Sequence, residues 1–217
     1  MRVSEAVAAR RSIRAYLDKP VANETIRTLL TRAARAPSGG NLQPWRIYVV
    51  NGEPMTRFKE FVLSQTERES PAYEIYPKKL TEPYRTSRFK VGEDMYKLLN
   101  IPREDKPARI RRLMENYQFF GAPAAIFCFI DRQMGPPQWS DLGMFLQTFM
   151  LLAQEEGLDT CAQESWSTRP DTVRRFVNAP EELTIFCGVA IGHGDPDVPV
   201  NSLVSEREEL DKFTTFV

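Results

Sequence analysis

Residues 124–130 read Ala-Ala-Ile-Phe-Cys-Phe-Ile, a run without a single charged side chain. A continuous apolar run of this length is typical of a strand that is buried on both faces. Residues 183–191 have the same character and predict a second buried strand. Together, the two runs indicate a sheet that lies inside the protein core.

The segment between these strands predicts a long helix from Trp139 to about Glu156. Its apolar residues recur at helical spacing, and Gly157 follows at the expected stop; they are Leu142, Phe145, Leu146, Phe149, Leu152 and Ala153. A helix this apolar needs cover on more than one side. Two explanations stay open: a central helix at a subunit interface, and a helix inside a large monomeric core.

Periodicity and end signals predict the remaining regular elements. One helix begins with Asn23 as its N-cap and stops before Pro37. The others are a strand over 45–50, an amphipathic helix around 55–62, a short strand from 158 and a small helix over 170–177. The chain therefore mixes helices and strands along its length.

The length of 217 residues suits one domain, or one domain with an insertion. Its 29 Lys and Arg balance its 29 Asp and Glu, so no overall charge favours nucleic acid or an acidic membrane. No uncharged apolar run reaches the roughly 18 residues of a membrane span, and residues 1–5 lack the apolar core of a signal peptide. We therefore expect a cytoplasmic protein.

Side chains that many enzymes use for catalysis are scarce. Cys128, Cys161 and Cys187 lie in or beside apolar segments, which indicates buried reduced thiols. With His193 as the single histidine, they do not match a zinc or iron site. The chain has no nucleophile elbow or Walker A sequence, and residues 192–194 form only half of a dinucleotide fingerprint. This composition suits an enzyme whose cofactor does the chemistry.

The string Arg10-Arg11-Ser12-Ile13-Arg14 is the first of two functional signals. In an extended segment side chains alternate, so Arg10, Ser12 and Arg14 project to one side. The planar guanidinium donates paired, charge-assisted hydrogen bonds to phosphate oxygens, so this side can hold a phosphate. A solvated basic turn is the alternative.

The second signal is the string Ala-Pro-Ser-Gly-Gly-Asn-Leu-Gln-Pro-Trp over residues 36–45. Residues 38–41 carry little side-chain bulk, and glycine lets the main chain approach a ligand closely. The string can therefore bring bare backbone up to a flat ring. An ordinary helix-to-strand turn would also use these glycines.

Residues 71–105 are rich in proline and aromatic side chains, and we interpret them as an insertion or lid over the active site. Their cations could meet an anionic substrate or a nucleotide phosphate, or could face solvent; they are Lys78, Lys79, Arg85, Arg88 and Lys90. The tail over 195–217 ends in Phe-Thr-Thr-Phe-Val. Such an apolar terminus requires a partner surface.

Together with Arg207 in the tail, the two strings resemble those of the FMN-dependent nitroreductase family. The resemblance covers essentially the whole chain and includes the apolar central helix followed by Gly157-Leu158. It implies a single α+β domain over residues 1–217, with a mainly antiparallel sheet flanked by helices. It also implies a homodimer that exchanges C-terminal strands and holds two FMN molecules at its interface.

The resemblance also assigns residues to the FMN phosphate and the flavin edge. By motif position, Arg10, Ser12 and Arg207 would hold the phosphate, with Arg11 assisting through its main chain or side chain. Arg14 would lie near the N1 and O2 edge of the flavin. A fixed positive charge there stabilises the reduced flavin electrostatically, so no further catalytic side chain and no metal are implied.

Further residues match positions around the flavin ring. Those expected from the other subunit are Pro37, Ser38, Gly39 and Asn41. The segment whose backbone faces N5 corresponds to Gln163, Glu164 and Ser165. Asp141, on the central helix, matches a position near the cofactor.

The implied activity is a two-step transfer at one face of the flavin. NADH or NADPH gives hydride to N5, and a nitroaromatic, quinone or related small aromatic acceptor then takes the electrons. The basic lid suggests a carboxylated nitroaromatic such as nitrobenzoate as the substrate. Two alternatives stay open: a reductive dehalogenase on the same scaffold, and a non-catalytic flavin-binding or redox-sensing module.

Overall fold

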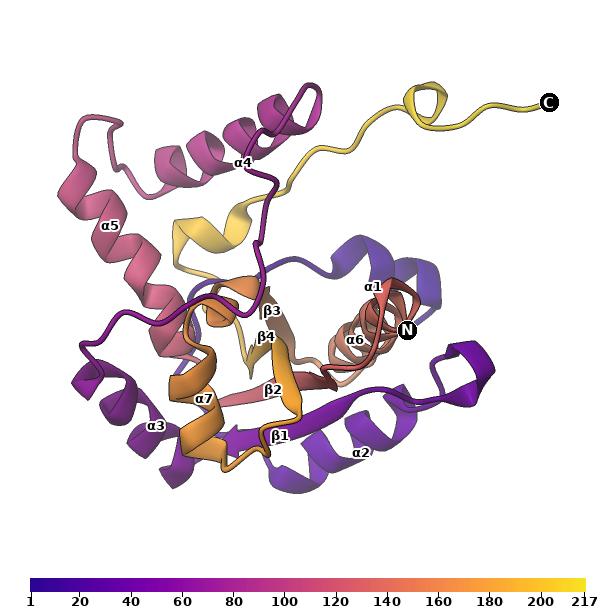
Figure 1. The fold of residues 1–217 in the computed structure, drawn as a ribbon. Coiled ribbons are helices and arrows are strands. Elements are labelled where there is room, and N and C mark those ends of the chain that lie inside the picture. The colour runs from indigo at the N-terminus through magenta and orange to yellow at the C-terminus, as the bar shows by residue number, and fades with distance from the viewer.

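One sheet of four strands, in the order β1-β2-β4-β3, forms the centre of the protein, for which a computed structural model describes all residues from 1 to 217. The strands are β1 (Arg46–Asn51), β2 (Ala124–Asp131), β3 (Asp159–Gln163) and β4 (Leu183–Gly192). Every neighbouring pair is antiparallel. The two most apolar strands, β2 and β4, are therefore central, and the expected α+β architecture is confirmed (Figure 1).

Two pairs of helices cover the two faces of this sheet. They are α2 (Asn23–Ala33) with α6 (Pro136–Glu155), and α3 (Glu53–Ser64) with α7 (Pro170–Val177). Strand β2 divides the core between them because its side chains alternate. Its even-numbered residues from 124 to 130 pack with α2 and α6, and its odd-numbered residues from 125 to 129 pack with α3 and α7. Both faces of β2 are thus buried, as its sequence predicts.

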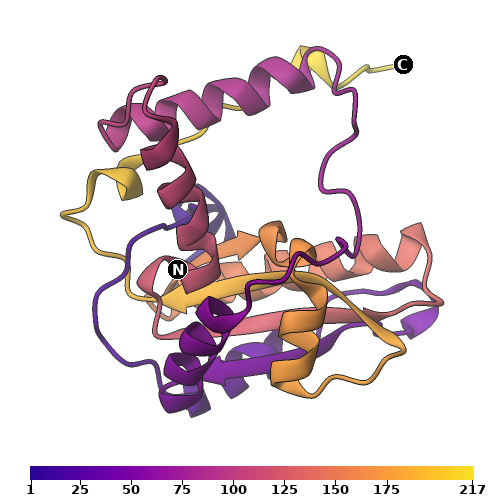
Figure 2. The same cartoon turned by 60° about the vertical axis from the view of Figure 1, so that its left-hand side comes forward.

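Three further helices lie outside these layers: α1 (Val3–Ala9), α4 (Tyr84–Leu98) and α5 (Lys106–Met114). Helix α4 runs above the sheet and is joined to it by extended chain at one end and by α5 at the other (Figure 2). It contains no fully buried residue. The segment 71–105, which we expected to be an insertion, therefore holds one regular helix that stands apart from the core.

The segment after α1 runs beside the sheet and fixes the position of the arginine string. Ser12 pairs with Thr160 of β3 in a parallel bridge, and the Ile13 amide donates to the Thr160 carbonyl at 3.0 Å. Further along, Tyr16 pairs with Gly194, just beyond β4. These contacts hold residues 10–16 in extended form along the edge formed by β3.

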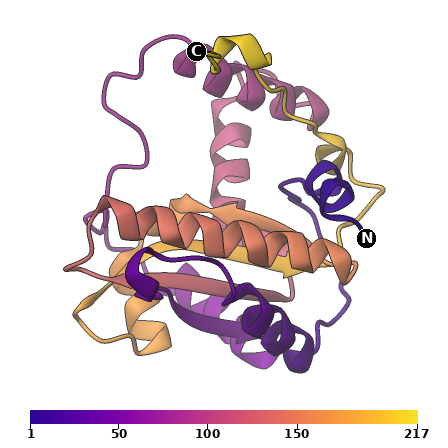
Figure 3. The ribbon, with the colours of Figure 1, turned by 90° about the vertical axis from the view of Figure 1, so that its right-hand side faces the viewer.

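The C-terminal tail leaves the body of the protein after a 3-10 turn at Pro199–Ser202. It passes beside α4 and ends away from the sheet (Figures 1 and 3). Phe213 is 67% exposed and Phe216 is 84% exposed. The tail forms no strand within the single chain, and its exchange between subunits stays a prediction.

The ends of two helices differ from the sequence prediction. Asn23 is the first residue of α2 rather than its N-cap, which is Ala22, because the Asn23 Oδ1 instead accepts a hydrogen bond from Asn51 Nδ2 at 2.8 Å. Helix α6 begins at Pro136 rather than Trp139, since proline is well tolerated in the first turn. The three cysteines are free and buried, as expected. None of the helices combines the length and hydropathy of a membrane span.

Candidate functional site

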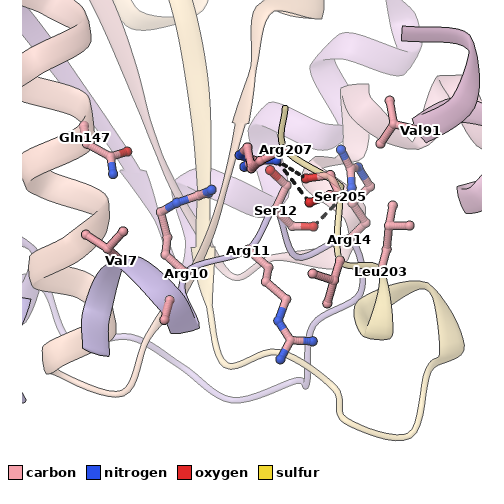
Figure 4. Close-up of a pocket in the computed structure, with 12 residues that line it drawn as sticks. Val7, Arg10, Arg11, Ser12, Arg14, Val91, Gln147, Leu203, Ser205 and Arg207 are labelled. Atoms are coloured by element: carbon pink, nitrogen blue, oxygen red, sulfur yellow. Dashed lines mark hydrogen bonds between the residues drawn. The ribbon is translucent and has the colours of Figure 1, made fainter. Parts of the chain in front are cut away.

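A cavity of about 650 Å³ lies where the segment after α1, helix α6 and the C-terminal tail meet. Its lining comes from distant parts of the chain, and the polar members are Arg10, Arg11, Ser12, Arg14, Gln147, Ser205 and Arg207. Apolar side chains complete the wall, among them Val91 of α4. Figure 4 shows this arrangement. Both ends of the chain are thus needed to form the cavity.

None of the four arginines that border this cavity has an acidic partner. Arg10, Arg11, Arg14 and Arg207 form no ion pair with any carboxylate in the chain. The Arg207 guanidinium donates only to oxygens of its own segment, at 2.8 Å to Ser205 Oγ and 2.8 Å to the Glu206 carbonyl. Guanidinium groups are well suited to bind oxyanions through charge-assisted hydrogen bonds. The cavity therefore has the character of an anion site.

Arg11 is oriented differently from its neighbours. Its side chain points away from those of Arg10 and Arg207 (Figure 4). It also lines a second groove, of about 360 Å³, together with Asp159 and Asp195. This orientation follows from alternation along an extended segment, which turns the side chain at position 11 opposite to those at 10 and 12.

The backbone of Arg14 is held from two sides. Its amide donates to Asn201 Oδ1 at 2.8 Å, and the Asn201 Nδ2 donates in turn to the carbonyls of Ala15 and Asp195. Its carbonyl accepts from Arg112 Nη2 at 2.9 Å. These contacts restrict how Arg14 can present its side chain to the cavity. Neither Asn201 nor Arg112 belongs to a motif that the sequence reveals.

In the segment at the end of β3, the side-chain polar groups of Gln163 and Ser165 turn inward, and two backbone amides stay free. Gln163 Nε2 donates to the Asn116 carbonyl at 2.7 Å, and Ser165 Oγ is buried without a partner. Glu164 and Ser165 are the first two residues of a 3-10 turn, where amides have no partner within the turn. Neither amide donates to another backbone group outside the turn. Two backbone N–H groups are therefore available to a ligand.

The next residue, Trp166, anchors this segment in the core. Its side chain is fully buried. Its ring lies 5.3 Å from that of Phe58, 4.8 Å from that of Phe119 and 5.3 Å from that of Tyr117, measured between centroids. A turn fixed in this way holds the two amides in a constant position.

Tyr73 extends over the same region from the segment that precedes α4. Its hydroxyl donates to the Phe186 carbonyl, and its ring packs edge-on against Trp139 at 5.4 Å between centroids. Burial raises the pKa of Tyr73, and the nearby carboxyl of Glu164 adds to this effect. Although Glu164 lies at the surface of the chain, partial desolvation raises the pKa of its carboxyl too. The Glu164 carboxyl thus keeps its proton to a higher pH than a fully solvated glutamate does.

The loop over residues 37–41 lies elsewhere, and none of its residues lines the cavity. Figure 3 shows the loop and α1 at opposite ends of α6. The Gly39 amide donates to the buried Asp141 carboxylate, at 3.2 and 3.4 Å to its two oxygens. Gly40, Asn41 and Gln43 have φ values of 57°, 58° and 49°, a left-handed conformation that is unusual for the two residues other than glycine. The loop is thus held in a strained form by α6.

The chain matches known proteins over nearly all of its length. The model described as the nitroreductase family matches residues 7–193. A nitrobenzene nitroreductase of Ectopseudomonas oleovorans is 35% identical over 219 residues, which cover 99% of this chain and 96% of that protein. A 4-nitrobenzoate reductase of Pseudomonas putida is 35% identical over 212 residues, covering 97% and 93%.

A solved structure matches equally well. The FMN and NADPH-dependent nitroreductase NfnB from Sphigopyxis sp. strain HMH superposes on this chain with a TM-score of 0.95. The two sequences are 43% identical, and the alignment covers 100% of this chain and 99% of that one. The architecture described above is therefore shared with this enzyme from end to end.

Proposed function

The chain belongs to the nitroreductase family, and from this premise we propose that it is an FMN-dependent oxidoreductase that takes electrons from NADPH or NADH and reduces nitroaromatic compounds. Two similar proteins are named for nitrobenzene and 4-nitrobenzoate, and a third for FMN and NADPH. When bound, FMN supplies the redox chemistry, because it can accept two electrons from a nicotinamide and pass them to an acceptor.

The observation that carries this proposal is the cavity with four unpaired arginines. Its donors fit a phosphate monoester: guanidinium groups from Arg10 and Arg207 and the Ser12 hydroxyl all border it. A phosphate bound there would meet positive charge that no carboxylate of the chain neutralises. Arg11, whose side chain points away, would contribute through its backbone.

Arg14 and the turn after β3 would orient the flavin ring. Arg14 borders the same cavity and would lie beside the N1 and O2 edge, where its fixed charge favours the reduced cofactor. The free amides of Glu164 and Ser165 would face N5 and donate to it. Because Trp166 anchors this turn, the donors need no rearrangement during the reaction.

The ring-lining loop would come from a second subunit. Pro37, Ser38, Gly39 and Asn41 lie too far along α6 to line the cavity of their own chain, which supports a homodimer. Asp141 would act through this loop, since it accepts from the Gly39 amide. The exposed phenyl groups of Phe213 and Phe216 would pack on the partner when the tails are exchanged.

The segment 71–105 would form a lid, since Val91 of α4 borders the cavity. Of the five lid cations named from the sequence, three are already paired: Lys78 with Glu74, Arg85 with Glu82, and Lys90 with Asp94. The two of these five without a carboxylate partner are Lys79 and Arg88, and the Arg88 guanidinium lies 4.0 Å from the centroid of the Tyr76 ring. Among the five, Lys79 and Arg88 are therefore the candidates for recognition of a carboxylated nitroaromatic.

An anaerobic absorbance experiment tests the proposal. The purified protein should bind FMN, lose the flavin absorbance when NADPH or NADH is added, and regain it when a nitroaromatic follows. A protein that takes up no FMN would contradict the cofactor assignment. A flavin that neither nucleotide reduces would contradict the oxidoreductase and leave a flavin-binding module.

The comparison of neutral and carboxylated substrates tests the lid. If Lys79 and Arg88 select the acceptor, K79Q and R88Q variants should lose turnover of nitrobenzoate more than that of nitrobenzene. Equal effects on both substrates would contradict this selection.

We propose the cytoplasm as the location of the protein, since free buried thiols are typical of reducing compartments.

A further inference from the structure

Arg112 of α5 lies directly behind Arg14. Its Nη2 donates to the Arg14 carbonyl at 2.9 Å, across 98 positions of the sequence. Its guanidinium also lies 4.9 Å from the centroid of the Phe120 ring, while its Nε is buried without a hydrogen-bond partner. The side chain is thus fixed by three elements: the helix that carries it, an aromatic ring and the backbone of Arg14.

The charge of Arg112 is not neutralised within the chain. No carboxylate forms an ion pair with Arg112 or with Arg14. Burial lowers the pKa of Arg112; Glu115 opposes this shift, and the neighbouring charge of Arg14 reinforces it. Tyr96 and Cys161 are the other titratable groups that face it.

Arg112 belongs to a group of converging cations. Burial raises the pKa of the Cys161 thiol on β3, and the charges of Arg14, Arg112 and Arg10 all act to lower it. Arg10 and Arg14 border the cavity and Arg112 contacts the Arg14 carbonyl, which places the three cations near one another. Like charges that are partly buried together are unfavourable unless an anion lies near them.

We propose that Arg112 is a positioning residue for Arg14 and that its charge makes the site bind reduced FMN, the more negative form, in preference to oxidised FMN. This inference rests on the proposed function. Arg112 acts in two ways: its hydrogen bond holds the Arg14 backbone, and its charge adds to the positive potential at the flavin edge that Arg14 faces.

Neighbouring arginines of α5 provide a matched control. Arg109 is engaged in a two-bond ion pair with Glu93, whereas Arg111 is exposed and forms no ion pair or hydrogen bond with another side chain. An R111Q variant therefore removes one positive charge from the same helix without disturbing the site. If net charge alone mattered, R111Q and R112Q would behave alike.

The experiment uses the full-length protein with FMN bound and measures the midpoint potential of the flavin by equilibration with a reference dye. In R112Q, the affinity for reduced FMN relative to oxidised FMN should fall at least tenfold, a shift of about 30 mV to more negative potential. R112K, which keeps the charge, should lie closer to wild type, and R111Q should match wild type.

Several outcomes would overturn the inference. One is an R112Q potential equal to that of wild type, in a variant whose circular dichroism and FMN content are intact. If R112Q does not fold, the R112K variant tests the inference instead. A midpoint potential of R112K that is about 30 mV more negative than that of wild type, although the positive charge is retained, would contradict the electrostatic role. A wild-type protein that takes up no FMN contradicts the proposed function and this inference with it, which distinguishes that failure from the others.

Discussion

Gly188 of β4 lies directly against the Trp166 indole, so that a Cβ atom added at position 188 would come within 2.5 Å of Trp166 Cδ1. Only a residue without a side chain leaves room for this ring between β4 and α3. Since Trp166 anchors the turn that carries the free amides of Glu164 and Ser165, the close approach links the packing of the core to the site.

The substitution Gly188→Ala should therefore lower the free energy of unfolding by about 1–3 kcal/mol, the usual effect of overpacking a core. Urea denaturation measures this. Gly92→Ala in α4 is the matched control, because nothing lies within 4 Å of a Cβ there; its stability should be unchanged or higher, since alanine favours a helix over glycine by about 0.5–1 kcal/mol. Equal effects of the two variants would contradict the packing argument.

Arg207→Ala should weaken FMN binding at least tenfold, or roughly 1.4 kcal/mol, because it removes one of the unpaired guanidinium groups of the cavity. A fluorescence titration of the apoprotein with FMN measures the dissociation constant. Lys212→Ala removes a cation from the same tail outside the cavity and should have little effect. An unchanged affinity in the Arg207 variant would exclude this residue from the phosphate site.

The raised pKa of Glu164 predicts how stability depends on pH. Desolvation favours the protonated carboxyl in the folded protein, so the folded state binds this proton more tightly than the unfolded state. Stability should then fall as pH rises from the ordinary pKa of glutamate to the raised one. Glu164→Gln removes this dependence.

Melting temperatures of the two apoproteins, measured from about pH 4 to about pH 7, test this expectation. The Gln variant should gain stability relative to wild type as pH rises. A wild-type protein that gains stability relative to the variant over the same range would show that the folded state instead favours the charged carboxylate.

We expect the C-terminal tail to stabilise the proposed homodimer. Replacing Phe213 and Phe216 together by serine should raise the dissociation constant of the homodimer by more than tenfold, because burial of each phenyl group contributes about 1.5–3 kcal/mol. Light scattering after size-exclusion chromatography, over a dilution series, measures this. Leu63→Ser, an equally exposed apolar position on α3, should leave the dimer intact; a dimer unaffected by the tail variant contradicts the exchange.

The core could be predicted from the sequence because its signals are local. Strand β2 and strand β4 are continuous apolar runs, and α7 begins and ends at the residues that its proline and its periodicity indicate. Helix α4 could not be predicted because it lacks such a signal: none of its residues is fully buried, so its sequence has no apolar stripe. Helix α5 likewise contains no buried residue.

Two residues of the candidate site, Asn201 and Arg112, could not be predicted from the sequence. Alternation along residues 10–14 correctly separates the side chain of Arg11 from those of its neighbours. By contrast, Asn201 contacts Arg14 across 187 positions and Arg112 contacts it across 98. Contacts of this kind depend on how the elements pack, and no spacing within a segment encodes them.

The cavity draws Arg10 and Ser12 from the segment after α1 and Arg207 from the segment that follows the sheet in the sequence. A proteolytic cut between Ser202 and Arg207 would therefore leave the sheet and its two hydrophobic clusters intact but remove one wall of the cavity. Cofactor content would then report whether this segment is still attached, since a clipped protein would keep its fold and lose one of the proposed phosphate ligands.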